Sequence, residues 1–373
     1  MRHLATIREI ASLRPIAGAD RIEVAQVDGW ECVVQKGEFH TGEHIVYIEV
    51  DSIVPERPEF EFLRDRKFRV RTIKLRGQIS QGLAMPVNLF DGLDKYNVGD
   101  DVTKVLGIKK WEPDERNRVS LNQSPLYMRR FHNRRLKWLY NKPWCKLFDK
   151  WLYVKSRAKF PSFLNKTDET RVQVLGDMLE KYKGTECYVT EKIDGQSITI
   201  WFDGRGKMAS RNYEILDKED YMWAAVRCEN VEAKVRRLFF PSRPMFFFLQ
   251  GELIGPGIQA NRYNKMTYFI YFFNSGFYDL GKVQYNSIDT LLGLADQAHL
   301  RTVPMLDDNY KLESDIDSIV EMSRGKSVLL DIPREGIVIR PEKDIYDNQI
   351  EGMVGNRISF KAINPDFLIK NDV

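Results

Sequence analysis

The feature that most constrains the fold is a series of strand-like segments in the second half of the chain, most of which carry charged residues. These segments cover residues 188–195, 248–255, 268–274, 335–340 and 358–361. Their apolar runs have the length of buried strands, and the stretches between them alternate between strand-like and helical patterns. We therefore predict an α+β domain over residues 160–373, which holds all the chemistry that we can identify.

The first hundred residues have the pattern of short strands separated by turns. Residues 21–27 alternate apolar and polar side chains, and Asp28-Gly29 supplies a hairpin turn. Residues 67–76 alternate basic and apolar side chains, so a single strand there would have one cationic face and one buried face. The pattern predicts an OB-type β-barrel over residues 1–105, either contacting nucleic acid or serving another interaction. The predicted RNA contacts are Arg69, Arg71, Lys74 and Arg76.

Residues 106–159 are predicted to be a basic, aromatic-rich linker that is partly helical. Between residues 124 and 160, Asp149 is the only acidic residue among many lysines, arginines and interleaved aromatic residues. Three interpretations stay open: a helix packed on a domain, a grip on the RNA backbone, or a helix on a membrane surface. No other part of the chain favours a membrane. The predicted RNA contacts in this linker are Arg129, Arg130, Arg134 and Arg135.

Composition narrows the class of protein. The chain has 373 residues, a net charge of only +4, and four cysteines that are far apart. A zinc site or a disulfide framework is not expected from that spacing, and no signal peptide or membrane-spanning run is evident. We expect a soluble protein of the cytoplasm or another intracellular compartment, with no obligate protein partner implied.

The central motif is Lys-x-Asp-Gly, in which Lys192 follows an apolar strand and precedes Asp194 and Gly195. A lysine is a poor nucleophile when protonated, and removing its proton at pH 7 costs roughly 4 to 5 kcal/mol. Burial, neighbouring cations or a metal ion can lower that cost. Asp194 could hold a hydrated Mg²⁺ near the amine. Alone the motif is weak, because it also fits a surface turn with a salt-bridged lysine.

An ordered set of further motifs favours a catalytic site. Glu252 stands between glycines on a predicted strand and could accept hydrogen bonds from ribose hydroxyls. The aromatic strand 268–274 could present one ring to a base. Glu335 precedes a glycine at a strand start, and Lys361 lies on a strand near the end of the chain, where it could neutralise a phosphate.

In their order, these motifs resemble those of the covalent nucleotidyltransferase superfamily of DNA ligases, RNA ligases and capping enzymes, over about residues 160–363. Residues 160–173 resemble the lead-in of nick-sealing RNA ligases, and residues 69–86 resemble the OB domain that precedes the catalytic domain in one RNA-ligase family. The resemblance implies an N-terminal OB barrel followed by an antiparallel-sheet nucleotidyltransferase domain. It explains the basic segment 124–160 least.

The resemblance also implies roles for single residues. Lys192 would attack the α-phosphorus of ATP and carry AMP, while Asp194 and Glu335 would bind Mg²⁺ or Mn²⁺. The other ATP contacts would come from Glu191, Arg171, Arg211, Glu252, Phe273 and Lys361.

Among these ATP contacts, Glu252 would bind the ribose and Phe273 would stack on adenine. Arg211 would grip ribose or the substrate 3′ end, Arg171 would contact the outgoing phosphates, and Lys361 the α-phosphate. Many relatives carry two lysines separated by one residue in the last motif. Here Ser359 and Ile363 flank Lys361, so one lysine suffices or another basic residue, such as Arg357, supplies the second charge.

The implied activity is sealing of 3′-hydroxyl and 5′-phosphate RNA ends, with nicks in duplex RNA as the expected substrate, through a lysyl-AMP and an adenylylated 5′ end. Capping enzymes and ATP-dependent DNA ligases usually carry their OB domain after the last lysine motif, where this sequence has about a dozen residues. NAD-dependent ligases need an extra upstream domain. The alternatives kept are an ATP-dependent DNA ligase and a non-catalytic RNA-binding protein with a degenerate transferase domain.

Overall fold

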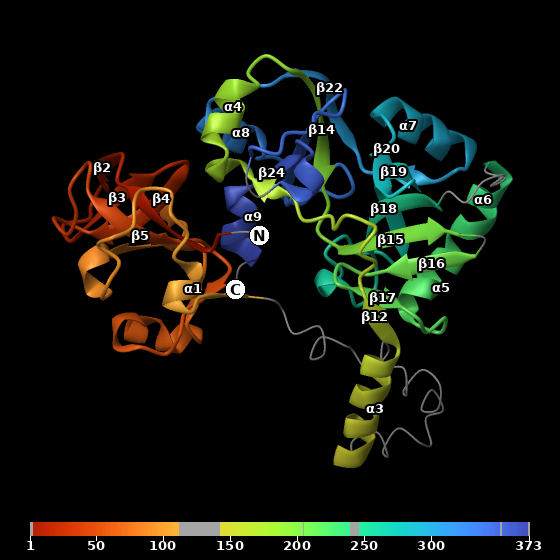
Figure 1. Ribbon diagram of the computed structural model, residues 1–373, viewed down its shortest axis with the longest axis horizontal. Helices are drawn as coiled ribbons and strands as arrows, with labels where there is room; N and C mark the ends of the chain where they lie inside the picture. The colour runs from red at the N-terminus through yellow and green to blue at the C-terminus, as the bar shows by residue number, and fades with distance from the viewer. Residues whose placement is uncertain (1–2, 112–141, 204, 239–245, 351–352, 372–373) are drawn as a thin grey trace.

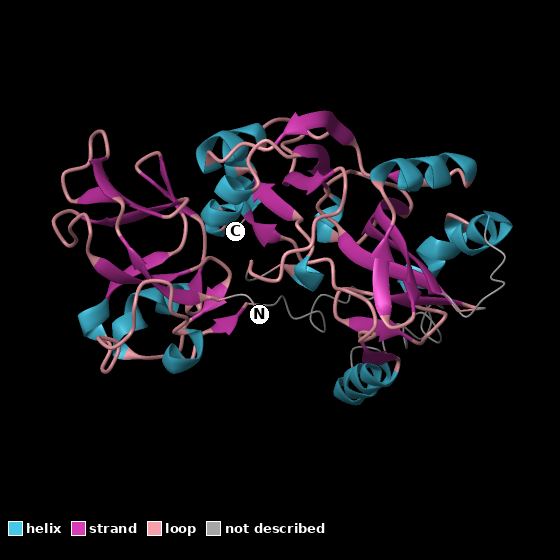
Figure 2. Ribbon diagram, turned by 45° about the horizontal axis from the view of Figure 1, so that its top comes forward, coloured by secondary structure: helices cyan, strands magenta, loops and turns pink. Residues whose placement is uncertain are grey.

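A computed structural model describes residues 3–111, 142–203, 205–238, 246–350 and 353–371. An N-terminal region of short strands lies beside a larger region made of two sheets (Figures 1 and 2). The mixture of helices and strands in the larger region agrees with the α+β prediction. The predicted boundaries at residues 105 and 160 stay predictions.

Four small antiparallel sheets form the N-terminal region, in the orders β1-β5-β10, β2-β3-β4, β11-β6-β7 and β8-β9. They surround two clusters of buried apolar side chains, one of which centres on Trp30 and Tyr47. The strands are β1 (Ala5–Glu9), β2 (Ser12–Pro15), β3 (Ile22–Val27), β4 (Trp30–Gln35), β5 (His44–Ile48), β6 (Ser52–Ile53), β7 (Arg69–Val70), β8 (Ile73–Leu75), β9 (Gln78–Ser80), β10 (Leu83–Pro86) and β11 (Lys109–Lys110). Among the described residues three helices accompany them, η1 (Pro58–Arg66), η2 (Val87–Leu89) and α1 (Thr103–Leu106).

The predicted hairpin around Asp28 is confirmed. Strands β3 and β4 pair antiparallel with Val27 opposite Trp30, and Asp28 takes a left-handed φ of 49° in the turn. On β4, Trp30 and Cys32 face the core while Glu31 between them is half-buried, as alternation across a sheet requires.

The prediction of one alternating strand over residues 67–76 is wrong. Helix η1 ends at Arg66, and both Lys67 and Phe68 adopt left-handed backbone angles before β7 begins. Residues 71 and 72 then separate β7 from β8. Because the register is interrupted twice, the basic side chains do not share one face, and Arg69 turns inward.

The larger region contains an eight-stranded and a five-stranded sheet. The first has the order β12-β17-β16-β15-β18-β19-β20 with β21 on β19, and the second has the order β13-β24-β23-β14-β22. Their strands are β12 (Arg157–Lys159), β13 (Thr170–Arg171), β14 (Glu186–Lys192), β15 (Gln196–Phe202), β16 (Gly206–Ala209), β17 (Tyr213–Ile215), β18 (Phe246–Ile254), β19 (Phe269–Asp279), β20 (Lys282–Tyr285), β21 (Arg301–Thr302), β22 (Met305–Lys311), β23 (Gly336–Pro341) and β24 (Phe360–Ile363). Most pairings are antiparallel, as predicted.

Helices cover both sheets and bury their apolar faces. Side chains of α5 (Tyr221–Cys228), α6 (Val231–Leu238) and α7 (Ile288–Gln297) join the core of the eight-stranded sheet. Side chains of α4 (Gly176–Lys181) and α8 (Ile316–Met322) join the core of the five-stranded sheet. The chain crosses from one sheet to the other at the turn between β14 and β15, which is the Lys-x-Asp-Gly motif.

Helix α3 (Pro143–Lys155) projects away from the rest of the molecule (Figure 1). Its apolar side chains at Trp144, Leu147, Phe148 and Trp151 are 60%, 69%, 46% and 52% exposed, so the prediction of a helix here is confirmed but not its packing on a domain. Over the described residues, no helix combines the length and the hydropathy that a membrane span requires.

Candidate active site

Lys192 is the last residue of β14, where that strand pairs antiparallel with the start of β23. The pairing sets Lys192 opposite Gly336, so Glu335 comes directly before the facing residue. The Lys192 Nζ lies 2.7 Å from Glu335 Oε1, and both side chains are mostly buried. The predicted nucleophile and one predicted metal ligand are therefore brought together.

Glu252 reaches the same place from the other sheet. Strand β15 begins just after the motif and pairs with β18, which sets Ser197 opposite Glu252. Gly195 leaves no room for a side chain, because an added Cβ would lie 2.5 Å from the Leu253 carbonyl oxygen and 2.9 Å from Glu252 Cγ. A glycine in the motif thus lets the turn pack against the strand that carries Glu252.

The charged groups around Lys192 shift one another's pKa values. Desolvation alone would lower the pKa of Lys192, but the carboxylates of Glu335, Glu252 and Asp194 outweigh it and raise that pKa above its ordinary value. Burial, with the neighbouring carboxylates and against the charge of Lys192, raises the pKa of Glu252 to about 8. The sequence argument called for a lowered pKa of the lysine, whereas the neighbouring protein groups raise the pKa of Lys192. We call these four residues the Lys192 cluster.

Asp194 belongs to the cluster electrostatically, but its carboxylate also has a cationic partner. Its Oδ2 lies 2.9 Å from Arg262 Nε, and its backbone N–H donates to the Tyr263 hydroxyl at 3.0 Å. Neither Arg262 nor Tyr263 was found from the sequence. Both residues follow an irregular stretch after β18, in which Gln259, Ala260 and Asn261 have left-handed φ angles.

Glu191 faces away from Lys192, whereas Phe273 lies at an irregularity of its strand, and the ATP contacts of both stay predictions. Glu191 is buried on the opposite face of β14 from Lys192, and its Oε2 accepts a hydrogen bond from the Val328 N–H at 2.8 Å. Phe273 lies where the β18–β19 register shifts between Gln250 and Gly251, so it occupies a β-bulge. A bulge turns a side chain out of the regular alternation, which suits a ring that has to meet a ligand.

Arg211 and Lys361 meet at one carboxylate that the sequence did not point to. Asp168 Oδ2 lies 2.6 Å from Arg211 Nη2 and 2.9 Å from Lys110 Nζ, and Asp168 Oδ1 lies 3.4 Å from Lys361 Nζ. Although burial opposes ionisation, the three cations lower the pKa of Asp168 well below its usual range. We call these four residues the Asp168 cluster.

Arg171 lies next to this cluster but pairs elsewhere. Strands β13 and β24 run parallel with Arg171 opposite Lys361, so the two side chains leave the same face of the sheet. The Arg171 Nη2 lies 3.3 Å from Asp51 Oδ2, which belongs to the N-terminal region.

Arg357 is not placed to supply a second positive charge beside Lys361, because other protein groups engage it. That residue is buried, with its Nε 2.8 Å from Asp344 Oδ1 and a hydrogen bond to Asn274. Arg340 lies closer to the motif: its Nε donates to Ser359 Oγ at 2.9 Å, and its guanidinium lies 5.6 Å from the centre of the Phe273 ring. Sequence reasoning placed Arg340 on a strand but gave it no role.

The predicted RNA contacts divide into three groups. Arg69 is only 9% exposed, is paired with Asp51 at 3.0 Å and lies over the Trp111 ring, so its prediction as a surface contact is corrected. Lys74 and Arg76 are exposed, while Arg71 is half-buried. The last group lies outside the described residues: Arg129, Arg130, Arg134 and Arg135.

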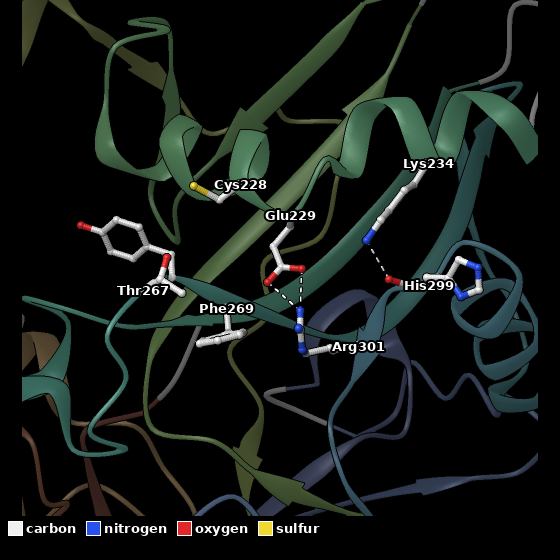
Figure 3. A pocket seen from close by; sticks show the side chains of 8 residues that line it. Cys228, Glu229, Lys234, Thr267, Phe269, His299 and Arg301 are labelled. Atoms are coloured by element: carbon white, nitrogen blue, oxygen red, sulfur yellow. Dashed lines mark hydrogen bonds and ion pairs between the residues drawn. The ribbon is translucent and has the colours of Figure 1, made fainter.

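A separate cavity of about 360 Å³ contains none of the predicted site residues (Figure 3). Arg301 points into it from β21 and pairs with Glu229 at 2.6 Å, beside the ring of Phe269. Lys234 donates to the His299 carbonyl oxygen at 2.8 Å. In this cavity Arg301 and Glu229 are thus paired with each other, and Lys234 is bonded to a backbone carbonyl.

Comparisons with known proteins cover both regions of the chain. Residues 4–87 match a family model described as an OB-fold domain, and residues 185–363 match the RNA ligase family model. No curated protein sequence matched.

Solved structures of an RNA ligase from Naegleria gruberi match at 32% identity. The structure with pyrophosphate has a TM-score of 0.78 and covers 100% of this chain and 99% of that chain. A variant with ATP and manganese has a TM-score of 0.77 with 100% of both chains covered. A variant with AMP and manganese has a TM-score of 0.78 and covers 100% of this chain and 99% of that chain.

Proposed function

The chain belongs to the RNA ligase family, and we propose that it uses ATP to join 3′-hydroxyl and 5′-phosphate ends of RNA through an AMP carried on Lys192. The observation that carries the proposal is the position of the Lys192 amine, at a strand end between the carboxylates of Glu335 and Glu252. Structures of variants of the Naegleria gruberi RNA ligase with ATP and manganese and with AMP and manganese support a nucleotide as the ligand.

In the first step, the Lys192 ammonium gives up a proton and the neutral amine attacks the α-phosphorus of ATP. A nitrogen–phosphorus bond forms, the bond from the α-phosphorus to the pyrophosphate oxygen breaks, and a second proton leaves the nitrogen. Glu335 Oε1 lies 2.7 Å from the amine and is placed to take the first proton. Pyrophosphate leaves with the bonding electron pair.

The donor set fits a divalent cation such as Mg²⁺ or Mn²⁺. Glu335 Oε2 is buried and accepts no hydrogen bond, which leaves an oxygen for a metal. Among the described residues no three His, Cys, Asp or Glu side chains form a ready-made metal site. Magnesium usually takes one or two carboxylates together with substrate phosphates and water, so Glu335 and Asp194 would suffice to hold it. When bound, it would supply positive charge that favours the neutral amine.

The remaining site residues orient the nucleotide. Glu252 would accept hydrogen bonds from the ribose, and Phe273, at its bulge, would stack on adenine. Arg211 and Lys361 already lie side by side at Asp168, and there they would neutralise phosphate oxygens. Phosphoryl transfer needs mainly such positioning and charge neutralisation.

In the later steps, the AMP passes from Lys192 to the 5′-phosphate, and the 3′-hydroxyl then displaces AMP to form a phosphodiester. We propose a nick in duplex RNA as the substrate, contacted by the exposed Lys74 and Arg76 of the N-terminal region. A nick holds both ends in register, so the enzyme need not bring two free strands together.

The first test is the intact mass of the protein after incubation with ATP and Mg²⁺. Wild-type protein and a Lys183→Ala control, changed at an exposed lysine of the same domain, should gain one AMP, and Lys192→Ala should gain none. A wild-type protein that never gains AMP would reject the proposal, as would AMP gained by Lys192→Ala.

Matched nicked duplexes made of RNA or of DNA distinguish the two ligase activities. We expect sealing of the all-RNA nick to be at least about tenfold faster, a difference of about 1.4 kcal/mol in activation free energy. Equal rates would favour a ligase with no preference for RNA, and faster sealing of DNA would favour a DNA ligase.

A further inference from the structure

The N-terminal region contacts the catalytic domain at β13 and at the residues on either side of it. Trp30 lies under the Arg171 guanidinium, 5.8 Å from its ring centre, and the Gly29 N–H donates to the Gln173 carbonyl oxygen at 3.4 Å. A Cβ on Gly29 would lie 2.7 Å from Ile316 Cγ2, so the hairpin turn fits tightly against α8. Two ion pairs cross the same boundary, from Asp51 to Arg171 and from Lys110 to Asp168.

Asp51 is fixed by its own backbone. Its N–H donates to the Val70 carbonyl oxygen at 3.0 Å, and its carbonyl oxygen accepts from the Trp111 N–H at 2.7 Å. Asp51 has a left-handed φ of 65°, a conformation that Asp and Asn tolerate better than most residues. Its carboxylate is therefore held in one place and shared by Arg69 and Arg171, at 3.0 and 3.3 Å.

Arg171 joins the proposed phosphate-binding residues to the N-terminal region. It leaves the sheet beside Lys361, and its guanidinium pairs with Asp51 of the N-terminal region. Without the Asp51 charge, the guanidinia of Arg69 and Arg171 would repel each other across the boundary. Arg171 would then move from its position next to Lys361.

We propose that Asp51 is a positioning residue for the transfer of AMP from ATP: the N-terminal region holds Arg171 where the departing pyrophosphate needs a cation. This inference rests on the proposed function and deepens it, because it assigns the barrel a part in the first chemical step as well as in RNA binding. It also predicts selectivity between steps. Pyrophosphate leaves only in the first step, so closure of a strand that already carries AMP does not need Arg171 in this position.

The test compares two reactions of the full-length protein carrying Asp51→Asn, which removes the charge and suits the left-handed backbone. One reaction is the gain of AMP from ATP, followed by intact mass to give kcat and the KM for ATP. The other is sealing of a nicked RNA duplex whose 5′ end is already adenylylated, without ATP. The matched control is Asp94→Asn, at an exposed acid of the same region.

We expect Asp51→Asn to slow the gain of AMP by about 10- to 100-fold, mainly in kcat, as for a misplaced catalytic group. Sealing of the adenylylated nick should stay within about twofold of wild type, which also shows that the variant is folded. In an Arg171→Ala background, Asp51→Asn should have little further effect, because the two residues act as one unit.

Three outcomes would overturn the inference: an unchanged rate of AMP gain, an equal loss in both reactions, or a full additional loss in the Arg171→Ala background. A wild-type protein that seals the adenylylated nick but never takes AMP from ATP would overturn the proposed function, and this inference with it. A normal wild type with an unaffected Asp51→Asn would overturn this inference alone.

Discussion

The Lys192 cluster and the Asp168 cluster are built with opposite charges. In the first, one cation is surrounded by the carboxylates of Glu335, Glu252 and Asp194. In the second, one carboxylate is surrounded by the cations Lys110, Arg211 and Lys361. With every group ionised, the Lys192 cluster carries an excess of negative charge and the Asp168 cluster an excess of positive charge, so the first suits a cationic ligand and the second an anionic one.

The difference teaches what each cluster requires from its ligand. Neighbouring carboxylates raise the pKa of Lys192, so under the proposed function the amine needs positive charge from the nucleotide's cation in order to lose its proton. The cations at Asp168 lie together, so under the same proposal a phosphate would take the place of that carboxylate. The first cluster thus suits a cationic ligand, and the second suits an anionic one.

The largest effect should follow from removing a carboxylate of the Lys192 cluster. Glu335→Ala and Glu252→Ala should each lower the rate of nick sealing by about 10²- to 10³-fold, as for loss of one preorganised group. Circular dichroism should show an unchanged fold. Sealing at the wild-type rate in either variant would remove that residue from the site.

A smaller effect is expected from the Asp168 cluster, since its cations can partly replace one another. Lys361→Ala should slow the gain of AMP on Lys192 by about tenfold, or about 1.4 kcal/mol. Lys343→Ala changes an exposed lysine in the same domain and serves as the control, with no change expected. A loss as large as that of Glu335→Ala would contradict the division of roles between the clusters.

The smallest effect tests the electrostatics of Lys192 directly, without ATP. Glu335→Gln removes a charge that raises the pKa of Lys192, so a larger fraction of the amine is neutral at pH 8. Acetylation of Lys192 by acetic anhydride at that pH, measured by mass spectrometry against Lys183, should rise by about threefold. As pH rises, labelling of the wild-type protein should increase, and the difference in labelling between Glu335→Gln and wild type should become smaller. A fall in labelling would reverse the sign that we assign to Glu335.

The sequence sufficed for the order of the catalytic strands, because that order depends on local strand patterns. The meeting of Lys192 with Glu335 depends on the pairing of two distant strands, and only the family resemblance implied it. It failed where one turn decides a register: the left-handed Lys67 and Phe68 split the predicted strand and turned Arg69 inward. Contacts of Asp168 and Asp51 were also missed, since they arise from the docking of distant segments. A lone acidic residue in a loop carries no sequence signal of its partners.

Helix α3 gives the molecule an optical property of its own. Trp144 and Trp151 are more than half exposed there, whereas Trp30, Trp201 and Trp223 are almost completely buried. Among the described tryptophans, those on α3 should therefore emit at longer wavelengths and be quenched most strongly by iodide. A molecule that binds to this helix should shift the tryptophan emission to shorter wavelengths and protect it from iodide. Binding can therefore be followed by the intrinsic fluorescence, without an added dye.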